Sequence, residues 1–169
     1  AKKKVDIYLY DISSGKLNIA AHNKMAGLKE GWVVSENGSL SFSKDGGRLF
    51  FGTAPKPKEK DTTLVDFEQP QLDIWTWNED YLQPVQLLRK ERELKQTYTA
   101  YINTSLTENF VQLGTLEVPT VSVPNEKMAD WAIVSNEKKY RIQSQWDYSR
   151  TSDIYLMNIK DGSVKLIKE

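Results

Sequence analysis

The sequence predicts an all-β protein made of antiparallel strands, and three features support this fold class. Short runs rich in β-branched and aromatic residues recur along the chain, as strands of a packed sheet require. Turn-forming residues separate these runs, and one strand motif occurs three times. The predicted strands are 5–12, 40–43, 48–53, 72–77, 98–102, 110–113, 131–134 and 153–159.

Four turns between these strands have the chemistry of tight hairpins. Each combines glycine with a small polar residue, and such residues tolerate the positive φ that a tight turn needs. The four turns are Ser14-Gly15, Asn37-Gly38, Asp45-Gly46-Gly47 and Asp161-Gly162. They support the antiparallel arrangement of neighbouring strands.

A long connection interrupts the strand pattern near the middle of the chain. Residues 54–71 contain three prolines and a cluster of charges, with few apolar positions between them. We therefore expect a long surface loop here. Such a loop is often functional when it is ordered, although a solvated insertion without a role is the simpler interpretation.

Residues 84–95 allow two interpretations. Leucines stand among charges, and Glu91 is spaced to pair with Lys95 one helical turn later, which would suit a short helix. We favour an outer strand that leads into a charged connection. The reason is that the segment follows the predicted strand at 72–77 as residues 16–21 follow the first strand.

Composition excludes several function classes. The chain has 23 basic and 23 acidic residues, so no net charge draws it to nucleic acid or to an anionic membrane. It has no cysteine, which excludes disulfides and thiolate chemistry. No apolar run reaches the length of about 18 residues that a membrane span needs. Because strand signals begin near residue 5, we expect the chain to derive from a longer protein.

One unit, Asp-Ile-aromatic leading into a strand, occurs at 5–10, 72–77 and 152–157. The copies lie farther apart than propeller repeats of roughly 40–50 residues, and we attribute the excess to insertions such as 54–71. We expect the repeated positions to have a structural role in fixing turns and strand edges. Together with the Asp-Gly turn they are Asp6, Tyr8, Asp45, Gly46, Asp73, Trp75, Asp153, Tyr155 and Gly162.

The repeat predicts a partial β-propeller with antiparallel four-stranded blades, because one blade cannot bury both faces until others stack on it. Residues 1–38 would end one blade, 39–95 would form a second that carries the 54–71 insertion, and 96–169 would form a further blade. A closed propeller needs roughly four to eight blades. We therefore expect exposed strand edges and apolar faces, and self-association through them.

Residues 40–51 contain the pattern apolar-Ser-x-Asp-Gly-x-x-apolar-apolar. With the Asp-Ile-Tyr-Leu strand, this pattern resembles the repeat of TolB-type propellers and of the N-terminal propeller of prolyl oligopeptidase family (S9) serine peptidases. Trp146-Asp147-Tyr148 resembles the peptidase-associated variety. Asn125-Glu126-Lys127 departs from the pattern, because it stands where an Asp-Gly turn is expected.

The resemblance implies a non-catalytic propeller segment that gates or positions peptide substrate for a catalytic domain absent from this chain. Its partners would be the remaining blades, that catalytic domain and peptides, in the bacterial periplasm or outside the cell. The alternative is a TolB-like propeller that acts as a protein-interaction or ligand-binding scaffold. A weaker third interpretation is a carbohydrate-binding module that uses the Trp-rich residues 75–81.

The chain offers no complete catalytic site and no predicted metal or cofactor site. A Gly-x-Ser-x-Gly elbow is missing, and the only histidine, His22, follows an outer-strand pattern. One histidine without cysteine leaves only carboxylates as metal ligands, and no calcium-loop spacing occurs. We therefore expect a non-enzymatic chain without a cofactor.

Five aromatic residues allow a structural and a functional interpretation, and we favour packing between blades. They are Trp75, Trp77, Tyr81, Trp146 and Tyr148. As candidates for ligand binding we keep Trp77, Tyr81, Trp146 and Tyr148. Asn37 and Asn103 each begin a glycosylation pattern, and the first is better explained as part of a turn.

Overall fold

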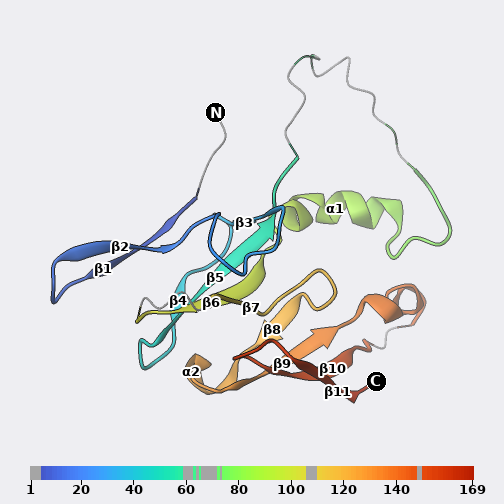
Figure 1. The fold of residues 1–169 in the computed structure, drawn as a ribbon. Coiled ribbons are helices and arrows are strands. Elements are labelled where there is room, and N and C mark those ends of the chain that lie inside the picture. Colours follow the sequence, from blue (N-terminus) through green and yellow to red (C-terminus); the bar gives the residue numbers. More distant parts are fainter. Residues whose placement is uncertain are drawn as a thin grey trace.

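The computed structural model describes residues 5–58, 63, 65, 72, 74–105, 110–147 and 150–169, apart from the side chain of Asn125. These residues form three antiparallel sheets that follow one another along the chain (Figure 1). The first, sheet A, is a hairpin of β1 (Ile7–Asp11) and β2 (Lys16–Ala21). The prediction of an antiparallel, mostly β fold is confirmed.

Sheet B is the central sheet. In space its order is β3-β5-β6-β7, and β4 pairs with the same edge of β5 as β3 does. Gly38, in the segment between β3 and β4, packs directly against Gly52 of β5. A Cβ atom on Gly38 would lie 2.4 Å from the Gly52 Cα, so this close approach of the two backbones requires glycine. The strands are β3 (Trp32–Val34), β4 (Ser41–Phe42), β5 (Arg48–Pro55), β6 (Tyr98–Asn103) and β7 (Phe110–Gln112).

Sheet C is a meander whose strands lie in chain order. They are β8 (Thr120–Ser122), β9 (Trp131–Asn136), β10 (Asp153–Asn158) and β11 (Val164–Lys168). A short helix, α2 (Pro124–Lys127), joins β8 to β9. Here Glu126 and Lys127 adopt φ values of 52° and 65°, so non-glycine residues take the conformation that glycine takes in the other turns.

Three of the four turns predicted from sequence have the expected conformation; the prediction of a tight hairpin at Asn37-Gly38 is wrong, because β3 and β4 each pair with β5 and not with each other. Gly15, Gly46 and Gly162 each adopt positive φ at a hairpin between paired strands. Aspartates tighten these turns, since Asp45 accepts hydrogen bonds from the Ser43 hydroxyl and the Gly47 N–H, and these bonds lower its pKa. Local sequence chemistry therefore determines these hairpins.

Sheet B lies between the other two sheets, so both of its faces are buried (Figure 1). Successive residues of β5 point to opposite faces, which sends Phe51 toward sheet A and Phe50 toward sheet C. The cluster between sheets A and B contains Ile7, Ala21, Val34, Leu49, Phe51, Ala100 and Ile102. The cluster between sheets B and C contains Phe50, Tyr101, Leu113, Ala132, Val134, Met157 and Ile159.

The outer faces of sheets A and C expose apolar side chains. On sheet A, Tyr8 pairs with Ile19 and Tyr10 pairs with Leu17, and all four side chains are exposed. On sheet C the exposed apolar residues are Trp131 and Ile133 of β9, Ile154 of β10, and Val164, Leu166 and Ile167 of β11. The described residues thus have the exposed apolar faces that the sequence predicts, while self-association stays a prediction.

The interpretation of 84–95 as an outer strand is wrong, because Gln83–Leu94 form helix α1. Pro84 lies in the first turn, where its missing N–H costs no hydrogen bond, and strong helix formers follow it. Glu91 and Lys95 form the expected pair at 3.8 Å. The helix buries none of its residues, and it lies beyond the end of β5 (Figure 1).

The prediction of a strand at residues 72–77 is also wrong. Residue 73 lies outside the described residues, and the others form no strand. Strand β6 takes the place beside β5 instead, and the pairing runs from Arg48 with Asn103 to Thr53 with Tyr98. Sheet B therefore extends across residue 95, where the sequence suggested a division. None of the helices in the described part of the chain is long and apolar enough to cross a membrane.

Candidate functional site

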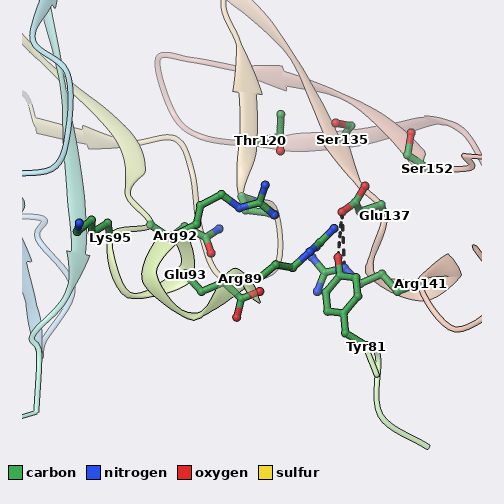
Figure 2. A pocket seen from close by; sticks show the side chains of 12 residues that line it. Tyr81, Arg89, Arg92, Glu93, Lys95, Thr120, Ser135, Glu137, Arg141 and Ser152 are labelled. Atoms are coloured by element: carbon green, nitrogen blue, oxygen red, sulfur yellow. Dashed lines mark hydrogen bonds and ion pairs between the residues drawn. The ribbon is translucent and has the colours of Figure 1, made fainter. Parts of the chain in front are cut away.

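Two adjoining cavities lie beside helix α1, and together we call them the basic groove; Figure 2 shows the first of them. Their volumes are about 610 and 660 Å³. The two cavities share Tyr81, Arg89, Arg92, Glu137 and Arg141. The groove is large enough for several residues of an extended ligand, since small-molecule pockets commonly measure about 300–1,000 Å³.

The walls of the groove come from equivalent connections in sheets B and C. Residues 56–97, which contain α1, join β5 to β6, and residues 137–152 join β9 to β10. The second connection contains two 3₁₀ turns, η2 (Lys138–Tyr140) and η3 (Gln143–Gln145). Antiparallel pairing brings the end of β9 and the start of β10 to one end of sheet C, where they meet α1.

Hydrogen bonds and ion pairs join the two connections. Arg141 lies 3.4 Å from the Asp80 carboxylate and 3.7 Å from that of Glu137. The Gln145 side-chain amide donates to the Asp80 carbonyl at 2.7 Å. The Gln86 amide of α1 donates to the Tyr81 carbonyl at 2.8 Å, which fixes residues 80–81 against the helix. The groove therefore has walls built from several elements.

Tyr81 lines both cavities of the groove, with two guanidinium groups beside its ring (Figure 2). The Arg89 guanidinium carbon is 4.0 Å from the ring centroid and that of Arg141 is 5.1 Å away. The Tyr81 hydroxyl donates a long hydrogen bond to Glu137 at 3.5 Å. Contact with the ring restricts the Arg89 side chain and leaves its in-plane N–H groups available to acceptors.

The arginines differ in their partners. Arg141 pairs with two carboxylates, although its buried Nε has no hydrogen-bond partner among the described residues. Arg89 and Arg92 have no carboxylate within ion-pair distance in the described part of the chain. Basic side chains outnumber acidic ones along the groove. They are Arg89, Arg92, Lys95, Arg141 and Arg150, against Glu93, Glu137 and Asp147.

Hydroxyl groups line the wall opposite the helix (Figure 2). Thr120 and Ser135 are direct partners in the β8–β9 ladder, and Ser152 directly precedes β10. None of these three hydroxyls makes a side-chain hydrogen bond to another described residue. A ligand in the groove would therefore meet hydrogen-bond donors on both walls.

The repeated aspartate of the third motif is bound to Tyr140, a residue that lines the second cavity. Asp153 is buried at the start of β10 and accepts a hydrogen bond from the Tyr140 hydroxyl at 2.6 Å. This hydrogen bond raises the pKa of Tyr140. The equivalent residues of the first motif are exposed: Asp6 directly precedes β1 and Tyr8 lies in it. Tyr155 is half-buried in β10.

Three of the four predicted binding aromatics, Trp77, Tyr81 and Trp146, are among the described residues, and of these only Tyr81 lines the groove. The interpretation of the tryptophans as buried packing residues is wrong, because Trp75, Trp77 and Trp146 are 68%, 94% and 85% exposed. They lie on connections outside the sheets, where no neighbouring sheet covers them. Asp73 and Tyr148 lie outside the described residues.

His22 lies in the turn that follows β2, and its Nδ1 accepts a hydrogen bond from the Lys24 N–H at 3.0 Å. It is not among the residues that line the groove. Within the described ranges, no cluster of three or more carboxylate and histidine side chains could hold a metal ion. The arrangement of donors suits the binding of an anion, and it contains no paired nucleophile and base.

No family model, curated protein or solved structure matches this chain.

Sequence reasoning found Tyr81 but missed the arginines that surround it. Arg89 and Arg92 are three residues apart, a spacing that places both on one face of a helix. That signal was present, and the interpretation of 84–95 as a strand concealed it. Arg141 belongs to no motif, and only the packing of 137–152 against residues 80–81 brings it to the groove.

Proposed function

We propose that this chain is a non-catalytic segment of a β-propeller that holds peptide ligands in position, in the manner of the propeller of an S9-like peptidase. One observation carries the proposal: sheet B is buried on both faces between two other antiparallel sheets. In a propeller every blade is covered in this way by its neighbours. Sheet A would then be the outer half of one blade, and sheets B and C would be the next two.

The position of the groove agrees with this arrangement. Its walls are the connections between the second and third strands of two successive sheets, if β3 and β4 count as one interrupted strand. In stacked blades such connections emerge at the same end of the assembly, where loops from neighbouring sheets can share one ligand. The propeller would thus position a peptide, and bond chemistry would belong to a separate catalytic domain.

A peptide-binding assay combined with mass spectrometry tests this proposal. We expect the purified chain to retain peptides from a mixed library without cleaving them, and to leave fluorogenic proline-containing dipeptide substrates intact. Turnover that is lost in His22→Ala would overturn the proposal, because the chain would then be an enzyme. Failure to retain any peptide would refute the positioning role.

The exposed outer faces of sheets A and C favour a second candidate, a TolB-like scaffold for protein interaction. Unpartnered apolar sheet faces are typical of association sites. On this hypothesis Ile133→Lys on sheet C, or Tyr8→Lys on sheet A, lowers the mass measured by light scattering at high concentration. A monomer for the unsubstituted chain at that concentration would contradict this candidate.

A further inference from the structure

The geometry points to an acidic peptide segment as the ligand of the basic groove, with Arg89 and Arg92 binding its carboxylates and Tyr81 holding Arg89 in position. This inference rests on the proposed function, because it names the chemical class of peptide that the groove selects.

The first argument is the state of the two arginines. Arg89 and Arg92 lie one turn apart on α1 and line both cavities. Neither forms an ion pair with a described carboxylate, whereas Arg141 on the facing wall has two such partners. A guanidinium group presents a planar fork that matches a carboxylate, so Arg89 and Arg92 have unused capacity for bidentate binding.

The second argument is the orientation of Arg89. Its guanidinium carbon lies 4.0 Å from the Tyr81 ring centroid, which restricts the side chain before a ligand arrives. Less conformational entropy is then lost on binding than for a freely moving surface arginine. Tyr81 itself is held through its carbonyl by Gln86, so the stacked pair is anchored to the same helix that carries the arginine.

The third argument is the wall opposite the helix. The hydroxyls of Thr120, Ser135 and Ser152 have no side-chain hydrogen bond to a described residue. A carboxylate between the two walls would accept hydrogen bonds from guanidinium and hydroxyl donors together. Hydrogen bonds to a charged acceptor are stronger than those between neutral groups.

The acidic residues of the groove select against a continuous polyanion. Glu93, Glu137 and Asp147 are interspersed among the basic side chains. A nucleic-acid backbone, with a phosphate at every step, would meet these carboxylates and be repelled. A peptide with separated Asp or Glu residues can place its charges beside the arginines and its neutral residues beside the acids. The chain as a whole also lacks the net positive charge that nucleic-acid binding favours.

Fluorescence anisotropy with labelled peptides tests the inference on the full chain. The probes are a short peptide with alternating Asp and Ser, the same peptide with Asn in place of Asp, and a short single-stranded RNA. We expect the acidic peptide to bind more tightly than the Asn peptide. Arg89→Gln and Arg92→Gln should each weaken its binding about ten-fold, the loss expected for one charge-assisted interaction.

Lys90→Gln is the matched control, because it removes the same charge from the same helix at a residue that does not line the groove. We expect it to change the affinity by less than about two-fold, as for a screened surface charge. Arg89→Lys keeps the charge but loses the planar fork, so it should bind the acidic peptide less tightly than the unsubstituted chain does. Circular dichroism should show that these substitutions preserve the fold, since none of the helix residues is buried.

Several outcomes would overturn the inference. Equal binding of the acidic and Asn peptides would remove the charge preference while leaving the proposed peptide-positioning function intact. An equal loss in Lys90→Gln and Arg89→Gln would show unspecific attraction to the helix. Binding of the RNA without binding of the acidic peptide would assign the groove to another ligand. If no peptide of any kind binds, the inference and the proposed function both fail.

Discussion

The two faces of sheet B are covered in different ways. Toward sheet A the contact is an apolar cluster with one polar link in the described part of the chain, the Val34 N–H of β3, which donates to the Asn23 side chain just after β2 at 2.7 Å. Toward sheet C an apolar cluster of similar residues is joined by polar links. The Arg48 guanidinium donates to the Ala129 carbonyl at 2.8 Å and pairs with Asp130 at 2.7 Å.

This difference indicates that the B–C contact is more specific in its geometry than the A–B contact. Apolar clusters are tolerant of small shifts, whereas a buried hydroxyl that donates to one carbonyl fixes the relative position of two strands. Tyr101 makes such a bond to the Ile159 carbonyl at 2.9 Å. The groove between the connections of sheets B and C depends on that fixed position.

The largest expected effect comes from neighbouring phenylalanines that point to opposite faces of sheet B. Phe50→Ala and Phe51→Ala each remove a side chain that is 2% exposed, and each should cost about 3–5 kcal/mol of unfolding free energy. Hydrogen exchange should distinguish the two variants. Phe51→Ala should lower protection mainly in β1 and β2, and Phe50→Ala mainly in β8 to β11. The same pattern of loss in both would contradict the comparison.

The polar link between sheets B and C gives the second prediction. Arg48→Met keeps the apolar stem but removes the donors to the Met128 and Ala129 carbonyls, and it should cost about 2 kcal/mol in urea unfolding. Lys44→Met is the control, since it breaks only an exposed ion pair with Glu126 and should cost less than about 0.5 kcal/mol. Equal losses would mean that the guanidinium has no special role.

A third substitution removes one hydroxyl. Tyr101→Phe loses the hydrogen bond to Ile159 and should cost about 1 kcal/mol. Tyr98→Phe provides the matched control, because its hydroxyl has no hydrogen-bond partner among the described residues. Thermal unfolding should show a lower midpoint for Tyr101→Phe than for Tyr98→Phe. The reverse order would refute the role assigned to the B–C hydrogen bond.

The smallest effect concerns the hairpin of sheet A alone. Hydrogen bonds from the Ser13 and Ser14 hydroxyls lower the pKa of Asp11 from 3.8 to about 2. A lowered pKa means that the charged carboxylate stabilises the turn above pH 3.8, and that this stabilisation is lost as the pH falls toward 2. The Ser13 amide resonance should report the titration, and Asp11→Asn should abolish it. A midpoint at the ordinary pKa would contradict the turn geometry.

Much of the fold follows from local sequence signals. The Gly15, Gly46 and Gly162 turns were predictable because a tight hairpin needs residues that tolerate positive φ. The burial of both faces of sheet B is favoured locally by β5, which places Leu49 and Phe51 on one face and Phe50 on the other. The sequence prediction missed helix α1. It treated 84–95 as the outer strand of a repeated unit, although the segment contains strong helix formers and the Glu91–Lys95 spacing of a helix.

By itself the sequence determined most of the antiparallel strands and the hairpins at Gly15, Gly46 and Gly162, because each depends on residues close together in the chain. Only the tertiary structure decided that β6 pairs with β5 across a long insertion, and that Tyr81, Arg89 and Arg141 meet in one groove. Those contacts join distant segments through packing, and no local pattern of residue types encodes which distant segment will pack there.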